Sequence, residues 1–347
     1  MKIDILPSIE TGRPIPLALT LAGHVADANA RRSLFADYQA RRSAQTLRQQ
    51  RRNLVLFRQW LDQVAADPGD LFSEPAAWQG LTWGLVANFT RWQLERGYAV
   101  STVNARLATI KRYAGLALQA GSLAADQYAM IGSITGYGRK EARHLDLKRV
   151  AAGLPVRQGH KAAQAVALTP EQAEALKNDH PDTPQGRRDR LLMCLLLDHG
   201  LRCGEVAGLQ RANLRLKQGE LHFFRPKVDR QQIHRLSRHT RLAARSYVKQ
   251  DQTTGAGPLL LASHKSGQLV AKAMSNRAIT KRVRHLGQRL GIEGLSAHDC
   301  RHYWASQAAR SGTPLDRLQE AGGWSSPAMP LHYIEVARIA NEGVRLK

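Results

Sequence analysis

The sequence has 347 residues, of which 43% are hydrophobic and 23% charged, so it can fill ordinary cores and suggests about two domains. Lysine and arginine outnumber aspartate and glutamate by 51 to 28, which gives a formal net charge of +23, and most of this excess lies in residues 201–290. No apolar run is long enough to cross a bilayer, and so basic a chain suits a polyanionic partner such as nucleic acid.

Two further features indicate a cytoplasmic protein. The first four residues include an acid and precede no long apolar segment, so a secretory signal is not expected. Cys194, Cys203 and Cys300 show no CxxC spacing, which disfavours disulfide scaffolds and zinc ribbons and fits a reducing compartment. Charge alone leaves RNA-binding, ribosomal and basic membrane-surface proteins open, although no long amphipathic helix with a bulky apolar face stands out.

The first part of the chain predicts an irregular leader and then a helical domain. Residues 1–30 carry three prolines, whereas residues 31–131 repeat apolar side chains at helical spacing. A helix is expected from Ser43, with an apolar face formed by Leu47, Leu54, Phe57 and Leu61. Further helices are expected from Trp83 to Arg96 and from Ser101, a favourable N-cap.

Residues 132–165 contain glycine, lysine and arginine and show weak periodicity and no bulky core signal, so we expect a linker there. A second domain, residues 166–347, begins with a capping box in which Thr169 is the N-cap, Pro170 the first helical residue and Gln172 the third. This combination of capping residues is typical of a helix that starts a new domain.

The second domain mixes helices with short strands. An apolar helix core is expected at residues 191–197, and strands are expected at residues 220–224 and 232–236. Ser275 caps a helix whose inward face holds Ile279, Val283, Leu286 and Leu290. The predicted fold class is therefore α+β and mostly helical, with an all-helical N-terminal domain and a C-terminal mixed domain that contains a small antiparallel sheet.

Basic side chains on the outward faces of these helices are the candidates for contacts with the phosphates of a nucleic acid, since such contacts dominate affinity. The candidates are Arg51, Arg106, Lys111, Arg112, Lys281 and Arg282.

Four short motifs carry candidate chemistry. Breaking a phosphodiester without a metal requires a nucleophile, cations fixed around the non-bridging oxygens and an acid for the leaving oxygen. Arginine suits the second task because its planar fork donates two parallel hydrogen bonds to a phosphate. The chain supplies, in order, Gly-Leu-Arg-Cys-Gly-Glu at 200–205, His-Asp-Cys-Arg-His at 298–302, Gly-Gly-Trp at 322–324, and a tyrosine nine residues later.

In this order and at these intervals, the motifs resemble the signature of the tyrosine recombinase (phage integrase) family. The resemblance covers residues 165–340 as a catalytic domain and, more weakly, residues 35–130 as the family's helical, SAM-like core-binding domain. It implies a site-specific DNA recombinase that acts in DNA integration or excision, with no metal and no cofactor. Cys300, where the family usually has an aliphatic residue, and the run at 320–323 depart from the pattern without removing a catalytic group.

The resemblance also implies roles for individual residues. Arg202 and Arg301 would clamp the scissile phosphate, and His298 would assist proton transfer or bind a phosphate oxygen. Trp324 would donate its indole N–H and pack against Tyr333, the nucleophile that forms a 3′-phosphotyrosine and frees a 5′-hydroxyl.

Two supporting roles complete the implied site. Glu205 would hold an arginine in place. A lysine in a turn between two strands would protonate the leaving 5′-oxygen; Lys227 matches that position best, and Lys217 is its rival.

Each candidate also has an ordinary structural interpretation. Arg202 could cap a helix, His298 could be a surface histidine, and Trp324 and Tyr333 could be core residues, but these interpretations do not predict the order of the motifs. A zinc site at residues 298–302 is disfavoured because no fourth ligand lies nearby in the sequence.

The resemblance implies double-stranded DNA as partner, bound inside a C-shaped clamp whose linker crosses the duplex. It further implies a homotetramer on two sites, strand exchange through a Holliday junction, and docking of residues 334–347 on a neighbouring protomer, while an accessory protein stays open. A type IB topoisomerase-like enzyme and a DNA-binding protein with a vestigial site are the alternatives.

Overall fold

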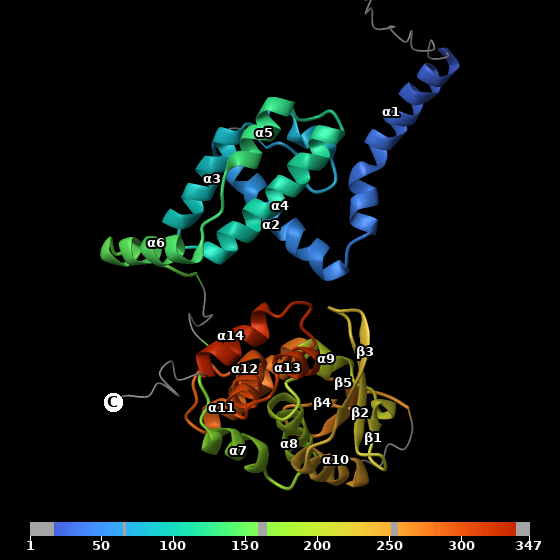
Figure 1. Ribbon diagram of the computed structural model, residues 1–347, viewed down its shortest axis with the longest axis vertical. Coiled ribbons are helices and arrows are strands. Elements are labelled where there is room, and N and C mark those ends of the chain that lie inside the picture. The colour runs from blue at the N-terminus through green and yellow to red at the C-terminus, as the bar shows by residue number, and fades with distance from the viewer. Residues whose placement is uncertain (1–16, 65–66, 159–164, 251–255, 338–347) are drawn as a thin grey trace, which may run out of the picture. The chain divides into compact units, whose positions relative to one another are not determined.

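Figure 1 shows a computed structural model of the chain, which describes residues 17–64, 67–158, 165–250 and 256–337. The chain divides into two compact units, Met1–Lys161 and Ala162–Lys347. Both the mostly helical class and the small antiparallel sheets expected from the sequence are confirmed. Within the described residues, no helix is both long enough and apolar enough to serve as a membrane span.

The N-terminal unit is helical throughout its described part. Its helices are α1 (Leu17–Ala40), α2 (Ala44–Val64), the short 3-10 helix η1 (Pro75–Trp78), α3 (Trp83–Glu95), α4 (Val100–Gln119), α5 (Ala125–Ser133) and α6 (Arg139–Ala151). Aromatic side chains fill the centre, where Phe57 and Phe89 have ring centroids 4.9 Å apart and Trp78 and Tyr113 are fully buried. The periodicity of α2 is confirmed, since Leu54, Phe57 and Leu61 are buried, with Leu47 packed beside them.

Two predictions for the N-terminal unit are wrong. Residues 17–30 are not an irregular leader but the first half of α1, and the three prolines that suggested irregularity lie in residues 1–16, outside the described residues. After Pro16 no proline interrupts the segment and alanine and leucine dominate it, so a helix is permitted. In α4 the N-cap is Ala99, without a side-chain cap, and Ser101 lies within the first turn.

The predicted linker at 132–165 is wrong in its middle part, because α6 occupies residues 139–151 and packs on the N-terminal unit. The Glu141 side chain accepts a hydrogen bond from the backbone N–H of Gly138, which starts the helix. Its last turn buries Arg149, whose guanidinium donates to the carbonyls of Tyr98 and Pro155 at 3.1 and 2.7 Å. Because α6 is anchored by a buried arginine, its apolar residues are too few for hydrophobic periodicity to reveal the helix.

The C-terminal unit surrounds two small antiparallel sheets with helices. The larger sheet has the order β1 (Leu214–Arg215), β2 (Glu220–Arg225), β3 (Arg230–Arg235), and the smaller one pairs β4 (Leu261–Ser263) with β5 (Leu269–Ala273). The helices are α7 (Pro170–Asn178), α8 (Pro184–Leu197), α9 (Cys203–Gly208), α10 (Arg238–Gln250), α11 (Asn276–Arg289), α12 (Ala297–Arg310), α13 (Leu315–Gly322) and α14 (Ala328–Ala337), with the 3-10 turn η2 (Arg211–Asn213) before β1. The predicted hairpin and the caps at Thr169 and Ser275 are confirmed.

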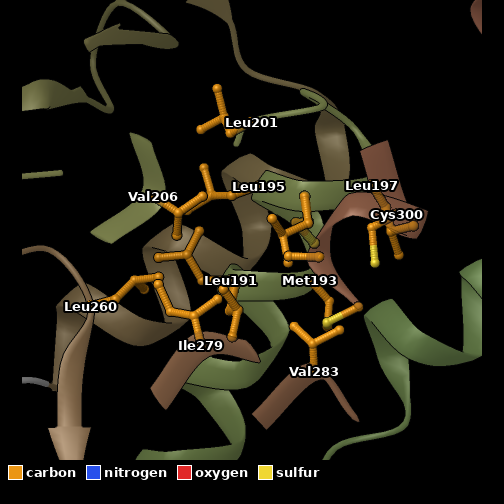
Figure 2. Close-up of a cluster of buried hydrophobic side chains, with 14 of the residues drawn as sticks. Leu191, Met193, Leu195, Leu197, Leu201, Val206, Leu260, Ile279, Val283 and Cys300 are labelled. Atoms are coloured by element: carbon orange, nitrogen blue, oxygen red, sulfur yellow. The ribbon is translucent and has the colours of Figure 1, made fainter. Parts of the chain in front are cut away.

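Helix α8 is the centre of this unit's core. Every residue from Leu191 to Leu197 is at most 3% exposed. Figure 2 shows Leu191 and Met193 on the side of Ile279 and Val283 of α11, and Leu197 beside Cys300 of α12. Burying each such aliphatic side chain contributes about 1.5–3 kcal/mol. Cys300 therefore serves as a packing thiol in the position where an aliphatic residue was expected. This core holds α9 and α12, which carry the two predicted arginines, in fixed positions.

Candidate active site

Arg202 lies at the N-cap of α9 and is held from two sides. Its Nη1 donates to Glu205 Oε1 at 2.8 Å, its Nη2 donates to the carbonyl of Gly323 at 2.9 Å, and its backbone N–H donates to the second Glu205 oxygen. The expectation that Glu205 fixes an arginine matches this geometry. The guanidinium is thus oriented before any ligand arrives.

Arg301, on α12, is only 2% exposed and spans the same region. Its Nη1 donates to the carbonyl of Gly200 at 2.6 Å and its Nη2 to that of Gly322 at 2.5 Å. The ring of Trp324 covers the guanidinium, with the ring centroid 4.5 Å from Cζ. Burial, and then the neighbouring charge of Arg202, lowers the pKa of Arg301 to about 9. The cost of confining these charges together favours an anion beside them.

A third arginine, which the sequence analysis missed, completes the cluster. Arg225 ends β2 fully buried, and its Nη1 lies 3.1 Å from both oxygens of Glu205 and donates to the Gly322 carbonyl at 3.0 Å. Its Nη2 donates to the Ala321 carbonyl and its Nε to Gln232. Burial lowers the pKa of Arg225 to about 10. The alternation of buried side chains along β2 places this residue on the inward face, and that period of two is the signal that could have revealed it.

The Gly-Gly-Trp motif has a steric explanation. Gly323 adopts a left-handed conformation with φ of +58°, and an added Cβ there would collide with the side chain of Arg225. A Cβ at Gly322 would collide with the ring of Trp324. Because neither glycine has a side chain, their carbonyls can approach the three arginines, and the indole of Trp324 can lie over the guanidinium of Arg301.

Tyr333 projects from α14 into this cluster and is 5% exposed. Its ring lies against that of Trp324, with centroids 5.8 Å apart, as expected for a tryptophan that packs against the tyrosine. Burial raises the pKa of Tyr333, and the charge of Arg301 opposes that rise. The hydroxyl lies 2.8 Å from Nδ1 of His302, at hydrogen-bond distance.

His302 is the second residue that the sequence analysis missed, because attention fell on the preceding histidine of the motif. His298 is exposed, and its ring meets that of His302 edge to face with centroids 4.5 Å apart. The expected single face for His298 and Arg301 is only partly realised, since Arg301 turns into the core. A histidine directly after Arg301 and one turn after His298 was the available signal.

Lys227 lies in the turn between β2 and β3, as expected for the candidate acid. It is exposed and lines a pocket of about 290 Å³ together with Trp324, Gly323 and Arg230. Its rival, Lys217, lies in the preceding turn between β1 and β2 and does not line this pocket. The geometry therefore favours Lys227.

Residues 167–338 match the sequence model of the Phage integrase family. The chain belongs to this family. The expectation of a tyrosine-type recombinase that cleaves and rejoins DNA is thereby confirmed.

Relatives and solved structures extend the likeness of this recombinase beyond its catalytic unit. Tyrosine recombinase XerD of Xanthomonas axonopodis pv. citri is 27% identical over 307 residues, which are 85% of this chain and 88% of that protein. The integrase of Salmonella phage P22 is 46% identical over 50 residues, 14% of this chain and 13% of that one. The fold resembles that of the Tn1549 transposon integrase in complex with a circular intermediate DNA, with a TM-score of 0.62, 15% identity and coverage of 87% and 94%.

Among the candidate DNA contacts of the recombinase's N-terminal unit, Arg51 and Arg112 are exposed and lie over the rings of Phe72 and Tyr38. Lys111 is half-buried and donates to the carbonyl of Gly132 at 2.7 Å. Arg106, expected to point outward, is instead half-buried: it lies 4.1 Å from the ring centroid of Tyr98 and donates to Gln93. Arg51 and Arg106 line one groove of about 500 Å³ with Arg48, Arg52 and Tyr98.

In the C-terminal unit the two candidates differ from each other. Lys281 is exposed on α11, as expected. Arg282 is half-buried, and its Nε donates to the buried carboxylate of Asp189 at 2.7 Å, so the expectation that it points outward is wrong. The carboxylate of Asp189 also accepts hydrogen bonds from Arg188, and such a buried carboxylate requires cationic partners.

Proposed function

We propose that this recombinase breaks and rejoins duplex DNA at a specific site with Tyr333 as its nucleophile. Attack on the phosphorus forms a 3′-phosphotyrosine and frees a 5′-hydroxyl, which later attacks the same phosphorus to restore the strand. The energy of the broken bond is retained in the phosphotyrosine, so ligation requires neither a nucleotide nor a metal. One observation carries the proposal: Tyr333 lies against Trp324, whose ring also covers the guanidinium of Arg301.

Arg202 and Arg301 are the proposed clamp for the scissile phosphate. Both are oriented by carbonyls of the two glycine segments, so little reorganisation is needed when charge develops on the non-bridging oxygens. Glu205 and Arg225 would act through Arg202 as positioning residues. The carboxylate of Glu205 accepts hydrogen bonds from both Arg202 and Arg225, and Arg225 also donates to the carbonyl of Gly322 in the glycine turn.

Lys227 is the proposed acid for the leaving 5′-oxygen, because it is the turn lysine that shares a pocket with Trp324. Trp324 would donate its indole N–H to the phosphate, and His298, at the solvent edge of the cluster, would bind a phosphate oxygen or assist proton transfer. The proposed machinery needs no cofactor.

The proposed partner is double-stranded DNA with a recombination site. Solved relatives in fold include a lambda integrase dimer bound to a core site and XerH bound to its palindromic difH substrate, with TM-scores of 0.59 and 0.54. We further propose that a homotetramer bound to two sites exchanges strands through a Holliday junction. The proposed location is the cytoplasm, at the nucleoid, and an accessory protein stays open. Docking of residues 334–347 on a neighbour stays a prediction, and its last ten residues lie outside the described residues.

Covalent trapping tests this proposal without knowledge of the DNA site. The parent chain is incubated with nicked duplex fragments of DNA from its source organism, and the mixture is then denatured. The DNA that remains attached to the protein is sequenced. We expect adducts at one recurring sequence and a phosphodeoxynucleotide on the peptide that contains Tyr333. Exchange between two plasmids that carry the recovered site distinguishes a recombinase from an enzyme that only relaxes supercoils.

Tyr333→Phe removes one oxygen and is the matched control. It should bind the recovered duplex with parental affinity and form no adduct. Tyr303→Phe and Tyr247→Phe should retain the adduct. An adduct on another tyrosine would move the nucleophile, and no adduct in the parent would leave only a DNA-binding protein.

A further inference from the structure

We infer that His302 is a catalytic residue of this recombinase and accepts the proton of the Tyr333 hydroxyl during strand cleavage. The inference rests on the proposed function of Tyr333. It assigns to His302 a task that the sequence motif suggests for His298.

The contact that carries the inference joins two helices. His302 lies on α12 and Tyr333 on α14, and the hydroxyl oxygen is 2.8 Å from Nδ1, within the range from which a general base abstracts a proton. The ring of His302 also meets that of Tyr333 at a centroid distance of 5.4 Å. The ring of His298 meets that of His302 edge to face, with centroids 4.5 Å apart.

The surroundings of His302 favour a neutral ring that can accept. Burial lowers the pKa of His302, the carboxylate of Asp299 opposes this, and His332 and Arg301 lower it further. Tyr333 and His298 are two further titratable groups whose rings contact that of His302. A lowered pKa favours the neutral ring, which carries one hydrogen on one of its two nitrogens. In the tautomer with that hydrogen on Nε2, Nδ1 has a lone pair for the hydroxyl proton.

Tyr333 needs such an acceptor. Its phenol is a weak nucleophile near neutral pH because its ordinary pKa is about 10, and burial raises that pKa. As the bond from the tyrosine oxygen to phosphorus forms, the hydroxyl proton moves to Nδ1 of His302. The bond from phosphorus to the 5′-oxygen breaks, and that oxygen takes a proton from Lys227. During ligation the same protons move in reverse.

The protonation state can be tested in the full chain without DNA. In protein labelled with ¹⁵N at histidine, we expect His302 at neutral pH as the tautomer with hydrogen on Nε2 and a bare Nδ1. Tyr333→Phe should shift the Nδ1 resonance of His302 and leave that of His24 unchanged. A hydrogen on Nδ1, or no response to Tyr333→Phe, would overturn the inference, and neither outcome depends on recombination.

Cleavage kinetics test the proton transfer itself on the duplex recovered by covalent trapping. His302→Ala should slow single-turnover cleavage by about 10² to 10⁴-fold with unchanged DNA affinity, and added imidazole should restore part of the rate. The residual rate should rise with pH, as the phenol ionises by itself. If the cleavage rate of His302→Ala falls by less than about threefold, or if neither imidazole nor raised pH restores it, His302 serves in packing alone.

A 5′-bridging phosphorothiolate separates the two proton transfers, because its sulfur leaves without an acid. It should restore cleavage by Lys227→Ala and should not restore cleavage by His302→Ala. Restoration of both variants would place His302 on the leaving-group side and overturn the inference. His144→Phe, a change at an exposed histidine of α6 in the N-terminal unit, is the matched control. If the parent forms no adduct, the proposed function fails, whereas the tautomer measurement still reports on His302.

Discussion

The two units of the recombinase hold their arginines in different ways. In the C-terminal unit Arg225 and Arg301 are buried and donate to backbone carbonyls, and Arg225 shares the carboxylate of Glu205 with Arg202. In the N-terminal unit Arg51 and Arg112 are exposed and lie over aromatic rings. The difference is between charges with fixed positions and charges that can move to meet a ligand.

Each arrangement suits a different task. Transition-state stabilisation depends on donors already placed where charge develops, so the C-terminal arginines are confined despite the cost of burial. Attraction to a phosphate backbone depends on the number and accessibility of charges, and aromatic support keeps a guanidinium extended at little cost. Variants should therefore separate the rate of chemistry from the strength of binding.

Arg301→Ala should produce the largest effect on catalysis. Loss of a fixed donor to the phosphate should reduce single-turnover cleavage by about 10³-fold, with little change in DNA affinity, because Arg301 is only 2% exposed. The measurements are covalent adduct formation and equilibrium binding on the recovered duplex. A parallel loss of binding and rate would show that Arg301 attracts DNA as the N-terminal arginines are expected to do.

Arg225→Leu should destabilise the C-terminal unit by about 3–5 kcal/mol, because it removes a buried partner of Glu205 and leaves the Ala321 and Gly322 carbonyls without that donor. Hydrogen exchange read separately over the two units should show loss of protection around β2 and α13 and none in α2 or α4. A loss below about 1 kcal/mol would mean that the guanidinium is dispensable for the fold.

Combined neutralisation of Arg51, Lys111 and Arg112 to glutamine should weaken DNA binding and leave the cleavage rate of bound complexes unchanged. If all three contact phosphates, the slope of log affinity against log salt should flatten by about 2 to 3, from a parent that loses about 10³ or more between 50 and 200 mM salt. Arg188→Gln, a buried arginine of the C-terminal unit, is a contrast that should alter stability and leave the slope in place. A flat salt response in the parent would contradict a phosphate-dominated interface.

Trp324→His should have the smallest effect, since histidine supplies both a ring and an N–H. We expect cleavage within about tenfold of the parent, whereas Trp324→Ala should lose more because stacking on Tyr333 and coverage of Arg301 disappear together. Adduct formation at fixed DNA occupancy measures both. Full activity of Trp324→Ala would reduce the indole to ordinary packing.

Local patterns of the sequence determined much of this protein. The capping box at Thr169, the apolar helix at 191–197 and the hairpin that contains Lys227 all follow from interactions over a few residues, and the structure has them. The order of the motifs likewise indicated the family and the residue types of the site. These features are readable because capping and hydrophobic periodicity act between near neighbours in the chain.

Only the tertiary structure decided which groups meet. His302 and Tyr333 are 31 residues apart, Arg225 reaches carbonyls nearly a hundred residues away, and α6 packs on the N-terminal unit through the buried Arg149. In each case a polar group is buried because a distant carbonyl, carboxylate or ring compensates for its lost hydration. No local pattern encodes the position of that distant partner.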